Sequence, residues 1–154
     1  MGRCYNSTSM IIEVNSESEM KTLASKIGAK LIGGETLELV GDIGAGKTTF
    51  TKGLALGLGV DDDVQSPSFT ISRLYDARDG LQLAHYDFYR LDDPGIMANE
   101  VSEFTSDGKV VTVIEWADAV SGFLPDNRIK VSIVAKSENT RQVEVSGLGW
   151  SVEI

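Results

Sequence analysis

Gly41-Asp42-Ile43-Gly44-Ala45-Gly46-Lys47-Thr48 matches the P-loop (Walker A) pattern G-x-x-x-x-G-K-[ST] at every fixed position. Glycines in such a loop allow consecutive backbone N–H groups to face inward and form an anion site. A helix that begins at the loop adds the positive end of its dipole. Lys47 is expected to reach the phosphates, and the Thr48 hydroxyl to bind Mg²⁺. The predicted phosphate-binding set is completed by Asp42, Gly44, Ala45, Gly46 and Thr49.

The residues around the loop support this interpretation. Residues 36–40 have the composition of a strand that leads straight into Gly41. Phe50, Leu54 and Leu58 recur at four-residue spacing, which predicts a helix with a buried face that stops near Gly59. The alternative, a glycine-rich turn with a lysine beside it, does not explain this order of strand, loop and helix.

Composition indicates one globular domain over residues 1–154, with residues 1–9 as a loose N-terminal extension. No apolar run approaches the roughly 20 residues of a membrane-spanning helix, and no secretory signal is visible. Cys4 is the only cysteine, which excludes an internal disulfide and favours a reducing, cytoplasmic setting. The net charge of −9 argues against a broad direct grip on nucleic acid.

Other stretches predict the rest of an α/β fold. A capping box at Ser16 and Glu19 starts a helix with one apolar face. Asp93-Pro94 marks a second helix start. Strands are expected at 10–14, 69–75, 81–86, 110–114, 128–134 and 142–146. The strands 69–75 and 81–86 should form a hairpin through Asp79-Gly80, and 128–134 and 142–146 an antiparallel pair at a sheet edge. Residues 150–154 form a short last strand or pack on the core. The predicted fold is a three-layer P-loop NTPase-like domain with a mixed, partly parallel sheet flanked by helices.

Two carboxylates are candidates for the metal and the chemistry. Glu115 directly follows the apolar run 110–114, at the sheet edge where a nucleotide is expected. It could hold Mg²⁺ through water, orient the attacking water, or do both. Asp87 is the second candidate, and strand alternation places it on one face with His85 and Tyr89. His85 is the only histidine. A lone histidine is more often a hydrogen-bonded structural residue than an acid–base group.

Three further residues are candidates for nucleotide contact. Ser66 and Ser68 flank Pro67, where hydroxyls could sense the γ-phosphate as switch segments do. A plain proline turn explains that segment equally well. Trp116 either packs in the core or covers the nucleotide.

Together these pieces resemble the TsaE (formerly YjeE) family, bacterial ATPases of tRNA threonylcarbamoyladenosine (t6A) biosynthesis. The resemblance spans roughly residues 15–135. It is carried by Gly41 to Thr49, Ser66-Pro67-Ser68-Phe69-Thr70, His85-Tyr86-Asp87-Phe88-Tyr89-Arg90-Leu91 and Ile114-Glu115-Trp116. The phosphate loop is common to many families, whereas the H-x-D-x-Y-R and E-W elements at these distances are far more specific.

The resemblance implies a Mg²⁺-dependent ATPase that binds ATP and ADP and is slow alone. It would drive turnover of a complex of TsaD-like and TsaB-like partners, and that complex would modify adenosine 37 of tRNA. The ATPase itself would act on tRNA only indirectly. By this resemblance, Lys47 and Thr48 are expected to hold phosphate and magnesium. Asp87 and Glu115 would be the functional carboxylates, and Trp116 would belong to the same site. Departures from the family pattern are Ser68 for threonine, Ala117 for proline, and Gly95-Ile96-Met97 for acidic residues.

Other functions remain open from the residues alone. A small-molecule kinase could use Arg73, Arg78 and Arg90 as clamps on an acceptor. A nucleotide-gated binding module would need no meaningful hydrolysis. A GTPase is disfavoured because no N-K-x-D motif is present, and a transporter ATPase because no L-S-G-G-Q-like segment is present.

Overall fold

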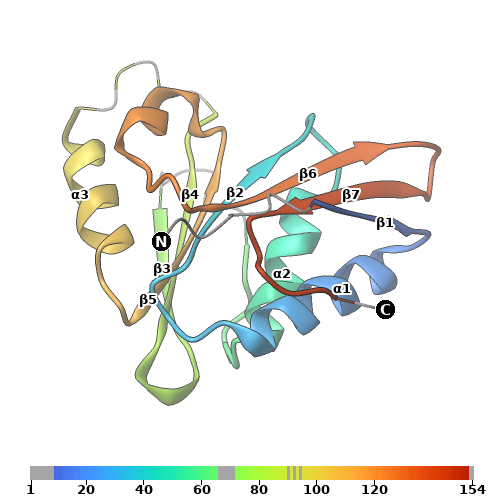
Figure 1. The fold of residues 1–154 in the computed structure, drawn as a ribbon, viewed down its shortest axis with the longest axis horizontal. Coiled ribbons are helices and arrows are strands. Elements are labelled where there is room, and N and C mark those ends of the chain that lie inside the picture. Colours follow the sequence, from blue (N-terminus) through green and yellow to red (C-terminus); the bar gives the residue numbers. More distant parts are fainter. Residues whose placement is uncertain (1–8, 66–71, 90, 92, 94, 153–154) are drawn as a thin grey trace, which may run out of the picture.

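A mixed sheet of seven strands organises the described part of the chain, residues 9–65, 72–89, 91, 93 and 95–152 of a computed structural model (Figure 1). The strands are β1 (Met10–Val14), β2 (Thr36–Val40), β3 (Ser72–Asp76), β4 (Gln82–Asp87), β5 (Val110–Glu115), β6 (Ile129–Ala135) and β7 (Arg141–Ser146). The helices are α1 (Glu17–Lys30), α2 (Lys47–Gly57) and α3 (Gly95–Thr105), with short 3₁₀ segments η1 (Arg78–Gly80) and η2 (Ala117–Phe123). None of these helices is both long and apolar enough to cross a bilayer.

The strand order β1-β7-β6-β2-β5-β4-β3 places the parallel strands at the centre. β2 pairs in parallel with both β5 and β6, and β4 pairs in parallel with β5. β3, β7 and β1 join by antiparallel pairing. The predicted mixed, partly parallel sheet is therefore confirmed. The antiparallel pair β6–β7 is also found, but the prediction that it forms the sheet edge is wrong, because β1 pairs outside β7.

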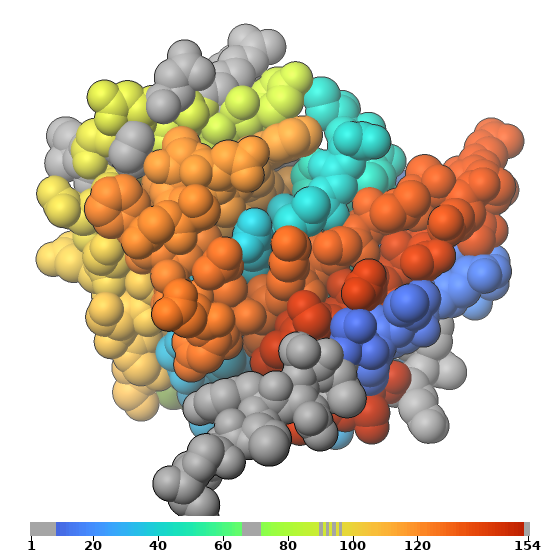
Figure 2. Space-filling model, turned by 45° about the horizontal axis from the view of Figure 1, so that its top comes forward, coloured from blue at the N-terminus to red at the C-terminus, as the bar shows by residue number. Residues whose placement is uncertain are grey.

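Helices cover the two faces of the sheet unequally. Inward residues of α1 and α2 pack against one face over most of its width, in a core that includes Leu23, Phe50, Leu39 and Val131. On the other face, α3 and η2 cover only the β4–β5 part, where Tyr86 and Val101 are fully buried. Burial, and secondarily the charge of Glu100, raise the pKa of Tyr86. β6, β7 and β1 are left at the surface (Figure 2), so the third layer spans only part of the sheet.

Glycines bring the backbones of α1 and α2 into direct contact. A Cβ at Gly57 would lie 2.1 Å from the Ser25 carbonyl oxygen, and one at Gly28 would lie 2.3 Å from the Leu54 carbonyl oxygen. At Gly53 the corresponding distance to the Lys21 carbonyl oxygen is 2.6 Å. Any larger residue would force the two helices apart, because backbone atoms cannot move aside as a flexible side chain can.

Most local predictions agree with the structure. The Ser16 hydroxyl accepts a hydrogen bond from the Glu19 N–H at 3.0 Å and caps α1 as expected. β3 and β4 form the predicted hairpin, described from Ser72 onward. α3 begins at Gly95, next to the predicted start. Residues 150–152 form no strand; instead Trp150 and Val152 pack on the core, the second of the two predicted outcomes.

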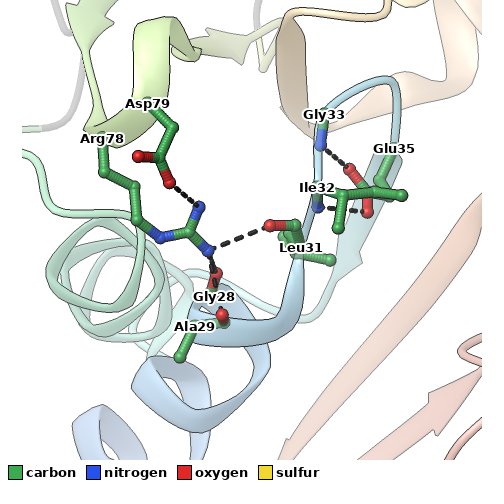
Figure 3. A network of polar contacts seen from close by, with 8 residues as sticks. All are labelled: Gly28, Ala29, Leu31, Ile32, Gly33, Glu35, Arg78 and Asp79. Carbon is green, nitrogen blue, oxygen red and sulfur yellow. Dashed lines mark hydrogen bonds and ion pairs between the residues drawn. The ribbon is translucent and has the colours of Figure 1, made fainter.

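Arg78 ties the β3–β4 corner to the carboxyl end of α1 (Figure 3). Its Nη2 donates to the carbonyl oxygens of Gly28, Ala29 and Leu31 at 3.0, 2.9 and 2.9 Å. A cation at this end also stabilises the helix dipole. Beyond this end of α1, the Glu35 carboxylate accepts from the N–H groups of Ile32 and Gly33 in the turn that leads into β2. Arg78 is therefore a structural residue.

Arg78→Ala is expected to lower the free energy of unfolding by about 1.5–3 kcal/mol, the range for hydrogen bonds to a charged group. Urea unfolding followed by circular dichroism measures this change. The matched control is Arg73→Ala, which removes an exposed arginine from β3 in the same hairpin. Equal losses in the two variants would contradict a specific contribution from the contacts to α1.

Candidate functional site

A cavity of about 650 Å³ lies at the carboxyl ends of β4 and β5, against the loop that joins β2 to α2. Parallel strands direct their carboxyl ends to one edge of the sheet, where α/β proteins bind ligands. The residues that line the cavity are Ser16, Glu17, Met20, Ile43, Gly44, Ala45, Gly46, Lys47, Thr48, Thr49, Asp87, Tyr89, Glu115, Trp116, Glu138, Asn139 and Arg141.

The loop before α2 has the backbone geometry of a phosphate cradle. Gly46 is the N-cap of α2 with φ +115°, a left-handed conformation that glycine adopts without strain. No side chain caps this helix end. The first turn also carries no acidic residue. The N–H groups and the positive dipole end are therefore available to an anion.

Lys47 lies within the cavity wall, nearly buried at 7% exposure. Its Nζ donates to the Gly41 carbonyl oxygen and, at 3.2 Å, to the Asp42 carbonyl oxygen. The same Nζ lies 4.3 Å from the centre of the Trp116 ring. Carbonyl dipoles and an aromatic face stabilise the charge of Lys47, which requires an anion for full compensation in a buried site.

Register places the two predicted carboxylates next to each other. Asp87 and Glu115 are paired residues at the ends of the parallel strands β4 and β5, and both line the cavity. Glu115 is 3% exposed, and its Oε2 lies 2.7 Å from His85 Nε2. Asp87 is partly exposed, and its Oδ1 accepts from the Tyr89 N–H at 3.1 Å.

Trp116 occupies an unusual backbone conformation beside these carboxylates. With φ 57° and ψ 53° it is left-handed, which is uncommon for a bulky residue and typical of functional sites. The turn sets its ring over Lys47, with the ring centre 4.9 Å from that of Tyr89. Trp116 therefore forms part of the wall of the cavity while it also packs, partly buried, against the core beneath α3 and η2.

Most of the predicted site residues share this cavity: Gly44, Ala45, Gly46, Lys47, Thr48, Thr49, Asp87, Glu115 and Trp116. Asp42 is exposed and lies outside it, in a second cavity on the other side of the loop. Ser66 and Ser68 lie outside the described residues.

Sequence reasoning missed Arg141, whose Nε donates to the Ala45 carbonyl oxygen of the loop at 3.0 Å. It also missed the part of the cavity wall formed by Ser16, Glu17, Met20, Glu138 and Asn139. Ser16 was recognised only as the cap of α1, and the other residues carry no local motif. The packing of α1 against α2 brings Ser16, Glu17 and Met20 to the loop, and the turn from β6 into β7 brings Glu138, Asn139 and Arg141.

The oxygen-bearing side chains at the cavity fit Mg²⁺ bound together with a nucleotide. Within the described ranges, no group of three or more His, Cys, Asp or Glu residues could hold a metal ion. Mg²⁺ in nucleotide sites is bound by one or two protein oxygens together with phosphates and water. The Thr48 hydroxyl and the carboxylates of Asp87 and Glu115, beside a cationic phosphate cradle, are a donor set of that kind.

Comparisons with known proteins place the chain among similar sequences. The family model for threonylcarbamoyl adenosine biosynthesis protein TsaE matches residues 14–143. The chain is 39% identical to the tRNA threonylcarbamoyladenosine biosynthesis protein TsaE of Bacillus subtilis over 142 residues, 92% of this chain and 87% of that protein. It is 36% identical to the protein of the same name from Treponema pallidum over 120 residues, 78% and 87% of the two chains. The crystal structure of Bacillus subtilis YdiB superposes with a TM-score of 0.75 at 34% identity, covering 92% and 87%.

Proposed function

The chain belongs to the TsaE family of t6A biosynthesis proteins, and on this premise we propose that it is a Mg²⁺-dependent ATPase. Its substrate is ATP, its products are ADP and phosphate, and it drives turnover of a TsaB–TsaD-like complex that modifies adenosine 37 of tRNA. The observation that carries this proposal is the convergence of the phosphate loop, Asp87 and Glu115 on one cavity.

The side chains have separate tasks in the proposed reaction. The loop N–H groups and Lys47 hold the β- and γ-phosphates and stabilise the charge that develops on them. Glu115 orients the attacking water, whose oxygen bonds to the γ-phosphorus as the bond to the bridging oxygen breaks. The electron pair of that bond stays on ADP, and the proton of the water leaves to solvent. Thr48, Asp87 and Glu115 would hold Mg²⁺, directly or through water. When bound, Mg²⁺ neutralises charge on the phosphate oxygens.

Partners and location follow from the family premise. TsaD-like and TsaB-like proteins are the proposed partners, with tRNA contacted only through them, and the cytoplasm is the proposed location. The net charge of −9 supports an indirect role, since proteins that grip nucleic acid directly do so largely through Lys and Arg.

Two of the three arginines that the kinase alternative would use do not lie at the cavity. Arg78 is committed to the carbonyl groups of α1. Arg73 is exposed and does not line the cavity. Arg90, the third proposed clamp, lies outside the described residues.

A phosphate-release assay tests the proposed function. The protein is mixed in excess over labelled ATP and Mg²⁺, with and without the TsaB–TsaD-like complex of the same organism. Slow formation of free phosphate, accelerated by the partner complex, is expected. Label transferred to a small molecule from a metabolite extract would indicate a kinase, and binding of ATP without any phosphate release, even with partners, would indicate a nucleotide-gated binding module.

A further inference from the structure

We propose that His85 is a positioning residue for Glu115: its imidazole Nε2–H holds Oε2 of the carboxylate and so directs Oε1 toward the cavity. The inference deepens the proposed function and rests on it. Both side chains are almost completely buried: that of His85 is 0% exposed and that of Glu115 is 4% exposed.

The sheet register explains why His85 can reach Glu115. On β4, His85 lies two residues before Asp87, and Asp87 pairs with Glu115 on β5. Residues two apart on a strand share a face. His85, Asp87 and Glu115 therefore lie on the face of the sheet that carries the phosphate loop, and the imidazole bridges the two strands at 2.7 Å.

The other ring nitrogen supports a role for this hydrogen bond. Nδ1 of His85 is buried and has no hydrogen-bond partner among the described residues. A neutral ring that donates from Nε2 leaves only an acceptor lone pair at Nδ1, while the alternative tautomer would bury an unpaired N–H and set two acceptors against each other. An unpaired buried polar atom is destabilising. An apolar side chain would avoid that loss, so the donor at Nε2 is the feature that distinguishes histidine here.

The two carboxylate oxygens of Glu115 also differ in their hydrogen bonding. His85 is the hydrogen-bond partner of its side chain within the described residues, and it engages only one of the two oxygens. The carboxylate also lines the cavity beside Lys47. Without the His85 contact, no hydrogen bond from a described residue would fix the orientation of the carboxylate. Anchoring it at Oε2 fixes the direction in which Oε1 meets water or Mg²⁺, as hydrogen-bonded partners of metal ligands do elsewhere.

Nitrogen NMR of the histidine ring tests the contact without any nucleotide. The chain has one histidine, so untagged protein labelled with ¹⁵N-histidine gives one set of ring signals. We expect the ring to carry a proton at Nε2, and we expect Glu115→Gln to shift the Nε2 signal. A ring protonated at Nδ1 alone, or signals unaffected by Glu115→Gln, would overturn the inference.

Kinetics separate positioning from simple packing. His85→Leu fills the buried space but removes the donor, and it is expected to lower the single-turnover rate of ATP hydrolysis by about 10- to 100-fold. Calorimetry should show unchanged ADP affinity, since the phosphate loop is intact. His85→Gln, whose amide nitrogen can take the place of Nε2, should recover most of the rate, whereas His85→Asn, whose amide is too short, should not.

A double-mutant cycle shows whether His85 acts through Glu115. In the Glu115→Gln background, His85→Leu should have much less effect than in the wild-type protein, because coupled residues are not additive. Equal effects in both backgrounds, or parallel losses of rate, ADP affinity and thermal stability in His85→Leu and His85→Gln, would overturn the inference. If the wild-type protein itself releases no phosphate, the proposed function fails, and the NMR result still decides the contact.

Discussion

Lys47→Ala is expected to slow ATP hydrolysis by about 100- to 1,000-fold, the usual effect of removing one preorganised donor to the transition-state charge. Lys47 is a buried cation of the cavity wall, and its Nζ contacts two loop carbonyl oxygens and the Trp116 ring. A triphosphate would replace these weak partners with full negative charge. Affinity for ATP should therefore fall together with the rate.

Calorimetry with ATP and a single-turnover phosphate assay measure both effects of Lys47→Ala. Lys52→Ala is the matched control, because it removes a lysine from the same helix but does not touch the cavity. Thermal unfolding of both variants verifies that the fold is retained. Hydrolysis and ATP affinity at wild-type levels in Lys47→Ala would contradict the proposed site.

In contrast to Lys47→Ala, Glu115→Gln is expected to separate ATP binding from hydrolysis. The substitution keeps the size of the side chain but removes the charge, and hydrolysis should fall by about 100- to 10,000-fold if Glu115 orients and activates water. Nucleotide binding should persist because the loop N–H groups and Lys47 are untouched. The variant should therefore accumulate as an ATP complex.

Asp118→Asn is the control for Glu115→Gln. Asp118 is an exposed carboxylate three residues further along the chain, and it does not line the nucleotide cavity. Comparing ATP affinity and single-turnover rates in the two variants separates a local role from a change in net charge. If Glu115→Gln and Asp118→Asn hydrolyse ATP equally fast, Glu115 has no role in the reaction.

The sequence predicted those parts of the site that depend on neighbouring residues. The phosphate loop and α2 follow from one uninterrupted motif. Glu115 followed from its place after a buried strand, because any such strand ends at the nucleotide edge of a parallel sheet. The helix caps and the β3–β4 hairpin were equally local.

Contacts between distant segments could not be predicted in this way. The His85–Glu115 pair depends on the register of β4 against β5, which is fixed by pairing along the whole strand. Arg141 reaches the loop across 96 residues of chain. Alternation of apolar residues also cannot identify an edge strand, and so the position of β1 outside β7 was missed.

The glycine contacts between α1 and α2 have a mechanical consequence. Because the two helix backbones touch at these glycines, no compressible layer of side chains lies between them there. A displacement of α2, which begins at the end of the glycine-rich loop, would therefore carry α1 with it as a rigid unit. Arg78 holds the carboxyl end of α1 at the β3–β4 corner, so a movement of the glycine-rich loop would also be felt at that corner.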